Sequence, residues 1–91
     1  MAYRVTYTDK AVEHLTQLQK SEPKAFAKAQ QLIEELKVHP RTGTGHPEQL
    51  KGYPEGRWSR RISQKHRLVY RIYEEDIVVL VLAAMGHYGD R

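Results

Sequence analysis

A segment rich in glycine and proline divides the 91-residue chain into two halves with different hydrophobic periods. The segment, residues 40–47, reads PRTGTGHP, and its two glycines and two prolines exclude regular structure. Before it, apolar residues recur mainly at helical spacing; after it, they alternate as in β-strands. This division predicts a single α+β domain.

The first half predicts one strand followed by two helices. Residues 2–8 alternate apolar and polar side chains of β-favouring types. Asp9 is a suitable N-cap for a first amphipathic helix that ends near residue 20. Pro23 suits the first turn of a second helix, which ends before Pro40 because the residue preceding a proline is pushed out of the α region. Two helices joined so closely form an antiparallel pair.

The second half predicts an antiparallel meander. Its last apolar run has no polar face, so it predicts a central strand with the helix pair packed on one face of an antiparallel β-sheet. The predicted strands are residues 48–52, 57–63, 67–73 and 77–84.

Composition excludes several kinds of chemistry. The chain contains no cysteine, so it has neither a disulfide nor a thiolate nucleophile, which fits a reducing cytoplasm. Its longest apolar run, residues 77–85, is too short to span a bilayer, and the first ten residues lack the apolar core of a signal peptide. We therefore expect a cytoplasmic protein without a membrane partner.

Positive charge is concentrated in residues 57–73, which read RWSRRISQKHRLVYRIY and contain no acidic residue. Together with the net charge of +4, this stretch predicts a basic hairpin whose first partner to consider is nucleic acid, with an acidic protein as the second. Its cations are Arg57, Arg60, Arg61, Lys65, Arg67 and Arg71.

Motifs for metal or cofactor binding are absent from the sequence. The five histidines form no HxxxH pair and have no carboxylate at ligand spacing, so we expect neither a metal nor a cofactor. His14 is expected on the polar face of the first helix. No GxxxxGK[ST], GxGxxG or GxSxG element supports nucleotide hydrolysis, dinucleotide chemistry or serine hydrolysis.

Metal-free RNA cleavage requires a base for the ribose 2′-OH, an acid for the leaving oxygen and cations around the phosphate. The chain offers these groups around its basic stretch, although a glutamate at a strand end is commonly just solvated and strand arginines commonly only bind phosphate. The candidates are His46, Glu48, Lys51, Arg61, Arg67, His87 and Tyr88.

Three pieces of the second half, GTGHPEQLKG, RWSRRISQKHRLVYRI and a late HY, together resemble the YoeB (Txe) toxins of the RelE superfamily. The resemblance implies a RelE-like fold and a ribosome-dependent endoribonuclease that cleaves messenger RNA in the ribosomal A site without a metal. It also implies a partner antitoxin, YefM/Phd-like or of another kind, besides the 70S ribosome and mRNA. Size and resemblance together allow a homodimer.

The resemblance assigns roles to individual residues. Glu48 is similar to the family's general base, Arg67 to the arginine that stabilises charge on the phosphate, and His87 to the general acid. Tyr88 is similar to the residue that helps to orient the substrate. Among the cations, Lys51 and Arg61 match further basic positions of the site, and Arg57 and Lys65 are interpreted as general electrostatic contacts to RNA.

Two departures from the family pattern affect the site. Gly52 stands where the pattern has a further histidine, a role that His46 could take over, so the residues leave open whether Glu48 or His46 is the base. Residues 89–91 extend the chain beyond the HY pair, and Asp90 would favour a charged imidazolium.

Two other functions remain open at this point. A non-catalytic basic module that binds RNA or the ribosome would use the same arginines, and a ParE-like gyrase inhibitor would share the fold without this chemistry.

Overall fold

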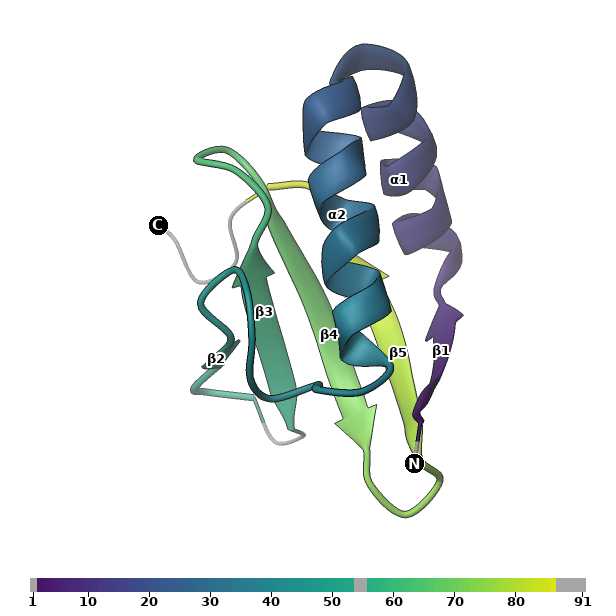
Figure 1. The fold of residues 1–91 in the computed structure, drawn as a ribbon, viewed down its shortest axis with the longest axis vertical. Coiled ribbons are helices and arrows are strands. Elements are labelled where there is room, and N and C mark those ends of the chain that lie inside the picture. The colour runs from purple at the N-terminus through teal and green to yellow at the C-terminus, as the bar shows by residue number, and fades with distance from the viewer. Residues whose placement is uncertain (1, 54–55, 87–91) are drawn as a thin grey trace.

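The protein folds as two helices on one side of a five-stranded sheet (Figure 1). A computed structural model describes residues 2–53 and 56–86. In chain order the elements are β1 (Arg4–Tyr7), α1 (Asp9–Ser21), α2 (Pro23–Leu36), β2 (Glu48–Gln49), β3 (Arg57–Arg61), β4 (Arg67–Tyr73) and β5 (Val78–Ala83).

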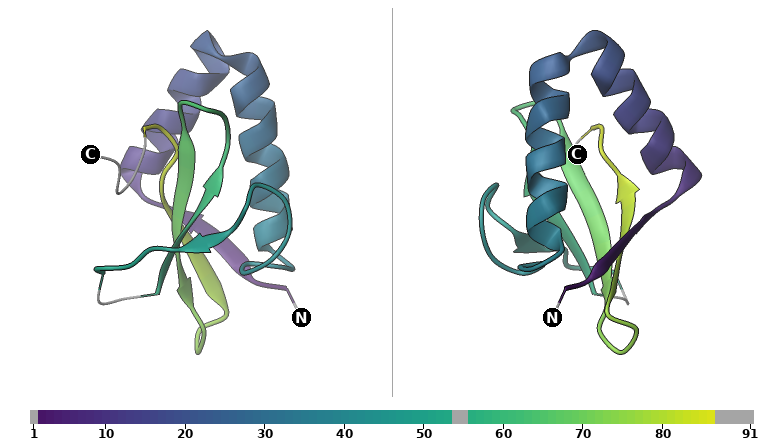
Figure 2. Two further views of the ribbon diagram at one scale, coloured as in Figure 1. Left: turned by 90° about the vertical axis from the view of Figure 1, so that its left-hand side faces the viewer. Right: turned by 45° about the vertical axis from the view of Figure 1, so that its right-hand side comes forward.

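The strands lie in the order β1-β5-β4-β3-β2. The four strands from β2 to β5 form the predicted antiparallel meander. The sheet as a whole is mixed, because β1 pairs with β5 in parallel. The double-sided apolar pattern of β5 correctly predicted a central position, which β5 has between β1 and β4. Figure 2 shows that β1 and β2 form opposite edges of the sheet.

The ends of the helices follow local signals with small differences from the prediction. Thr8, not Asp9, is the N-cap of α1, since the Thr8 hydroxyl accepts a hydrogen bond from the Ala11 N–H at 3.0 Å. Pro23 occupies the first turn of α2 as predicted. The last helical residue is Leu36, and Pro40 is buried beyond it in the loop that leads to β2.

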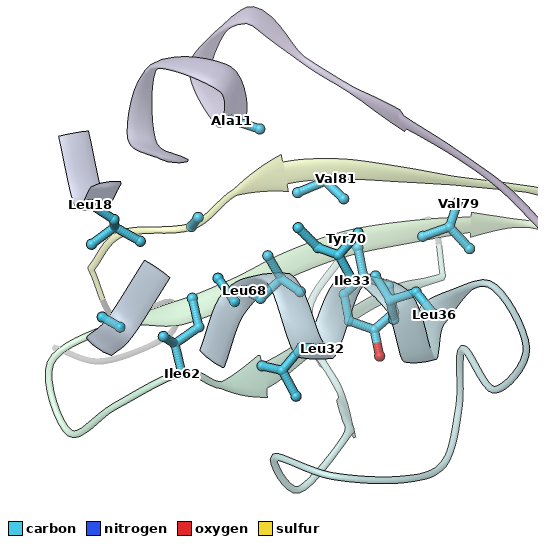
Figure 3. Packing of buried hydrophobic residues seen from close by; sticks show 13 residues of the cluster. Ala11, Leu18, Leu32, Ile33, Leu36, Ile62, Leu68, Tyr70, Val79 and Val81 are labelled. Atoms are coloured by element: carbon cyan, nitrogen blue, oxygen red, sulfur yellow. The ribbon is translucent and has the colours of Figure 1, made fainter. Parts of the chain in front are cut away.

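The hydrophobic core fills the space between the helix pair and one face of the sheet (Figure 3). Leu68 and Tyr70 of β4 are fully buried in it, whereas Trp58 and Ile72 pack at its margin. This arrangement confirms that the alternation of β4 separates a core face from an opposite face. The helices contribute Ala11, Leu18, Ala25, Ala29, Leu32, Ile33 and Leu36.

The face of the sheet that points away from the helices, here called the open face, carries the predicted site residues Glu48, Arg61 and Arg67. Strand β2 is shorter than predicted and ends at Gln49, so Lys51 lies in a turn. Among residues 2–53 and 56–86, neither α1 nor α2 has the length and hydropathy of a membrane-spanning helix.

Candidate active site

Two arginines lie directly opposite each other at one end of the open face. Arg61, the last residue of β3, pairs with Arg67, the first residue of β4. Directly opposite residues in an antiparallel pair have Cβ atoms about 5 Å apart, and like charges there destabilise the sheet. An anion bound between the two guanidinium groups would offset this repulsion, so the pair is a candidate phosphate site.

Glu48 joins the same face from the neighbouring strand. It lies opposite Ser59, which is two residues before Arg61, so Glu48 and Arg61 are diagonal neighbours roughly 7–8 Å apart. The Glu48 side chain is exposed, whereas Ser59 is buried between the strands. A carboxylate therefore stands beside the arginine pair and is accessible to a substrate.

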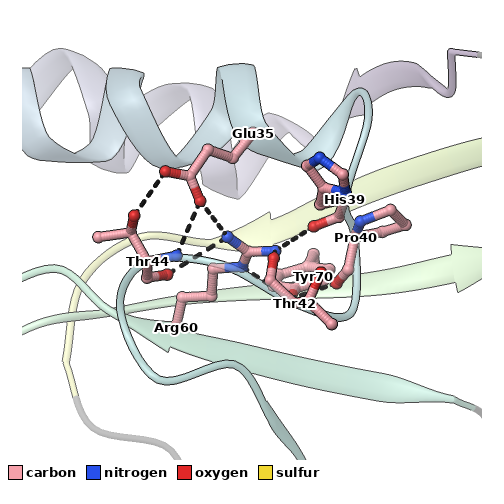
Figure 4. Close-up of polar contacts among 7 residues, drawn as sticks. All are labelled: Glu35, His39, Pro40, Thr42, Thr44, Arg60 and Tyr70. Atoms are coloured by element: carbon pink, nitrogen blue, oxygen red, sulfur yellow. Dashed lines mark hydrogen bonds and ion pairs between the residues drawn. The ribbon is translucent and has the colours of Figure 1, made fainter.

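A buried arginine holds the loop that leads to Glu48 (Figure 4). Arg60 is fully buried and faces α2, because it alternates with the outward-facing Arg61. Its Nη2 donates to the Thr42 carbonyl at 2.7 Å and to the His39 carbonyl, and its Nη1 donates to the Thr44 carbonyl at 3.3 Å. These bonds gather three successive parts of the loop around one guanidinium.

The same cluster includes a carboxylate from α2. Glu35 accepts hydrogen bonds from the Thr44 hydroxyl at 2.6 Å, from the Thr44 N–H at 2.9 Å and from Arg60 Nη1 at 2.8 Å. The bonds from Thr44 and then from Arg60 lower the pKa of Glu35, so the carboxylate stays ionised beside the cation. The loop is further joined to β3 by a 2.7 Å bond from the Arg61 N–H to the Gly45 carbonyl.

The described C-terminal end of the chain also meets the arginine pair. The Arg67 N–H donates to the Gly86 carbonyl at 2.9 Å. His87 and Tyr88, the predicted acid and its neighbour, lie outside the described residues. The residue that precedes His87 is therefore hydrogen-bonded to the backbone of Arg67.

The remaining predicted cations are spread around the site. Arg57 lies at the other end of β3 opposite Arg71, and its guanidinium is 4.9 Å from the centre of the Tyr53 ring. Lys65 lies in the β3–β4 turn, exposed, with Nζ 3.6 Å from Glu22 Oε2. The geometry does not bring either residue into the Glu48–Arg61–Arg67 group.

Lys51 and His46 flank Glu48 in sequence. Lys51 is exposed two residues after β2. His46 is exposed two residues before Glu48 and adopts a positive φ of 53°, an unusual conformation for a residue with a side chain. Both are accessible from solvent near the proposed base.

Comparison with known families identifies the class of protein. Residues 7–88 match the model of the YoeB-like toxin of bacterial type II toxin-antitoxin systems. The chain belongs to this family. It is 36% identical over 85 residues to the toxin YoeB of Streptomyces coelicolor, with 93% of this chain and 99% of the relative covered.

Solved structures agree with the YoeB assignment. The YoeB/ParE toxin of Agrobacterium tumefaciens superposes with a TM-score of 0.86 at 33% identity, covering 93% of this chain and 99% of that one. Staphylococcus aureus YoeB, solved as a dimer, gives a TM-score of 0.84 at 29% identity, covering 97% and 100%. In complex with YefM, the S. aureus protein gives a TM-score of 0.80 at 28% identity, again covering 97% and 100%.

Two polar residues of this YoeB-like chain have contacts that differ from the sequence-based prediction. Arg60 was grouped with the surface cations, and the alternation with Arg61 was the signal that would have placed it in the core. His14 was predicted on a polar helix face; it is instead partly buried, and its Nδ1 accepts the Ala84 N–H at 3.1 Å. No group of three or more His, Asp or Glu residues suited to a metal ion occurs in the described part of the chain.

Proposed function

We propose that this YoeB-like toxin is a ribosome-dependent endoribonuclease that cleaves mRNA in the ribosomal A site and so inhibits translation. The observation that carries the proposal is the group formed by an exposed carboxylate, Glu48, and the opposed pair Arg61 and Arg67 on one open face of the sheet. A base beside two phosphate-binding cations is the arrangement that transphosphorylation of RNA requires.

The proposed reaction is a transphosphorylation within the RNA, in which the phosphorus gains a bond to the 2′-oxygen and loses its bond to the 5′-oxygen. The Glu48 carboxylate takes the proton of the 2′-OH, and the 2′-oxygen attacks the adjacent phosphorus. Arg67 and Arg61 stabilise the charge that develops on the phosphate. The bond from phosphorus to the 5′-oxygen breaks, His87 gives that oxygen a proton, and the products are a 2′,3′-cyclic phosphate and a 5′-OH; Tyr88 helps to orient the substrate.

The partners proposed are the 70S ribosome with mRNA and a cognate antitoxin. The S. aureus complex of YoeB with YefM supports an antitoxin of that kind, and the S. aureus YoeB dimer supports self-association. Action on the ribosome would occur in the cytoplasm, and the residues proposed for the reaction include no metal or cofactor ligand.

The test compares Glu48→Gln with wild type on translating ribosomes, with mRNA ends mapped by primer extension. Loss of a general base should lower the cleavage rate about 10²–10⁴-fold while ribosome binding stays within a few fold. Glu75→Gln is the matched control, because Glu75 is an exposed carboxylate beyond the far end of β4 from Arg67 and should leave the rate unchanged.

Two outcomes would reject the proposed reaction. An mRNA with 2′-deoxyribose at the cleaved nucleotide offers no nucleophile, so its cleavage would exclude transphosphorylation. Equal cleavage profiles for Glu48→Gln and wild type would exclude Glu48 as the base. Ribosome binding without cleavage in every variant would indicate a non-catalytic module, and inhibition of DNA gyrase instead would indicate a ParE-like toxin.

A further inference from the structure

A buried histidine that the proposed reaction does not use lies beside the described C-terminal end of the chain. His66 is only 5% exposed, in the turn between β3 and β4. Its carbonyl accepts the N–H groups of Ile62 at 3.1 Å and Ser63 at 3.2 Å, and its own N–H donates to Ser63 Oγ at 3.2 Å. These hydrogen bonds hold the His66 backbone, from which the imidazole extends.

Both ring nitrogens of His66 have partners. Nδ1 lies 3.0 Å from the backbone nitrogen of Gly86, and Nε2 lies 3.0 Å from Glu22 Oε2. A backbone N–H only donates, so Nδ1 accepts and carries no proton, and Nε2 carries the hydrogen and donates to the carboxylate. The neutral tautomer with its hydrogen on Nε2 therefore satisfies both the contact with Gly86 and the contact with Glu22.

Glu22, the partner of His66 Nε2, is itself held in place by backbone hydrogen bonds. It is the residue between the two helices: its N–H donates to the Leu18 carbonyl at 2.7 Å, and its carbonyl accepts the Phe26 N–H at 2.9 Å. The hydrogen bond with His66 lowers the pKa of Glu22, which keeps an ionised acceptor in front of Nε2. Among the described residues, Lys65 Nζ also lies near this carboxylate, at 3.6 Å, and His14 is a further titratable group near His66.

Gly86 is held on both sides of its backbone. Its N–H donates to His66 Nδ1, and its carbonyl accepts the Arg67 N–H at 2.9 Å. Its φ of +85° is a conformation that side-chain-bearing residues rarely adopt. Two consecutive residues, His66 and the proposed phosphate ligand Arg67, thus hold Gly86, the residue before His87.

We propose that His66, supported by Glu22, is a positioning residue that holds Gly86 so that the next residue, His87, can protonate the leaving oxygen. This inference rests on the proposed function, and it assigns to His66 a role through Gly86 rather than contact with RNA. A misplacement of about 1 Å in a catalytic group costs about 10²-fold in rate, which is the size of effect expected if His66 loses its contact with Gly86.

Two substitutions separate the two nitrogens of the ring. His66→Asn places an amide oxygen near the Nδ1 position and keeps an acceptor for Gly86; His66→Gln places an amide N–H near the Nε2 position and keeps a donor for Glu22. We expect His66→Gln to lower kcat about 10²-fold with KM for programmed ribosomes within threefold, and His66→Asn to stay within about fivefold of wild type. Equal losses in both variants would overturn the inference.

Gly86→Ala tests the same positioning role without replacing the buried His66 ring. A Cβ at Gly86 meets no atom within 4 Å, so the substitution acts on the backbone, where φ is +85°. We expect the same fall in kcat as for His66→Gln, while the thermal unfolding midpoint of the protein stays unchanged. This variant keeps the inference testable if His66→Gln does not fold.

The decisive readout is an mRNA whose scissile 5′-oxygen is replaced by sulfur, because a thiolate departs without an acid. Rescue of His87→Ala, His66→Gln and Gly86→Ala alike, with no rescue of Glu48→Gln, would support the inference. Rescue of His87→Ala alone would overturn it and leave the proposed function intact. Failure to rescue His87→Ala would reject His87 as the acid, and the positioning role of His66 with it.

Discussion

Replacing Arg60 with methionine removes a buried cation while retaining an unbranched apolar side chain. In the folded protein the Arg60 side chain is fully buried, and it bonds to Glu35, to the loop carbonyls and, through Nε, to the Tyr70 hydroxyl at 3.1 Å. The substitution leaves the Glu35 carboxylate and the loop carbonyls without this donor. Breaking a buried ion pair from one side costs about 3–5 kcal/mol.

The position of Glu35 determines which part of that range applies. Its side chain is 26% exposed, so water partly rehydrates the carboxylate and favours the lower end of the range, about 3 kcal/mol. The loop carbonyls that lose a donor, such as that of Thr42, add about 1 kcal/mol. A loss of about 4 kcal/mol is a large fraction of a total stability of about 5–15 kcal/mol. The thermal midpoint should fall by at least about 16 °C, at about 4 °C or more per kcal/mol for a domain of this size.

Urea unfolding followed by circular dichroism measures this loss, and Arg61→Met is the matched control. Arg61 is the next residue, carries the same side chain and is exposed, so its substitution should not lower stability by more than about 0.5 kcal/mol. Glu35→Gln and Arg60→Met together should cost less than the sum of the single changes, because both act on one network. A loss below about 1 kcal/mol for Arg60→Met, or an equal loss for Arg61→Met, would refute the structural role of Arg60.

Two further predictions concern charge and pH. Arg61→Gln removes the repulsion with Arg67, so it should stabilise the fold by about 0.2–1 kcal/mol at low salt, with the gain shrinking at high salt, while RNA binding weakens. Thermal unfolding and filter binding at both salt concentrations check this, and no salt dependence of the gain would contradict it. Burial lowers the pKa of His14, so the unfolded chain binds more protons and stability should decline as pH falls below about 6.5. In urea unfolding, His14→Asn, which keeps an acceptor for the Ala84 N–H, should flatten that decline; an unchanged slope would contradict the role of His14.

Local patterns predicted the helices and strands of this fold, because the apolar residues of a helix and of a strand recur with different periods along the sequence. The alternation in β4 separated Leu68 and Tyr70 from Arg67, and the burial of the first two confirms it. The glycine and proline segment correctly marked the end of the helical half. The pairing of β1 with β5 had no such signal, because a parallel pair joins residues more than 70 positions apart through backbone groups alone.

The contacts of the candidate site that were missed are long-range and polar. Glu22, His66 and Gly86 meet through hydrogen bonds across 44 and 20 positions of sequence. No spacing rule links such residues, since their approach depends on the completed sheet. The burial of Arg60 has a local signal in the sequence, because strict alternation along β3 places it on the opposite face from Arg61.

The β3–β4 hairpin repeats one arrangement at the two ends of its turn. At each end an arginine of a strand follows a buried polar residue: Arg61 follows Arg60 in β3, and Arg67, the first residue of β4, follows His66 of the turn. Each buried residue bonds to a segment from elsewhere in the chain, Arg60 to the loop that leads to Glu48 and His66 to Gly86 before His87. Because each buried residue is joined directly to its arginine in the chain, the proposed phosphate-binding cations and the supports of the proposed base and acid keep a fixed relation to one another. Substitutions at the buried positions should therefore impair the proposed catalysis without removing a group that contacts RNA.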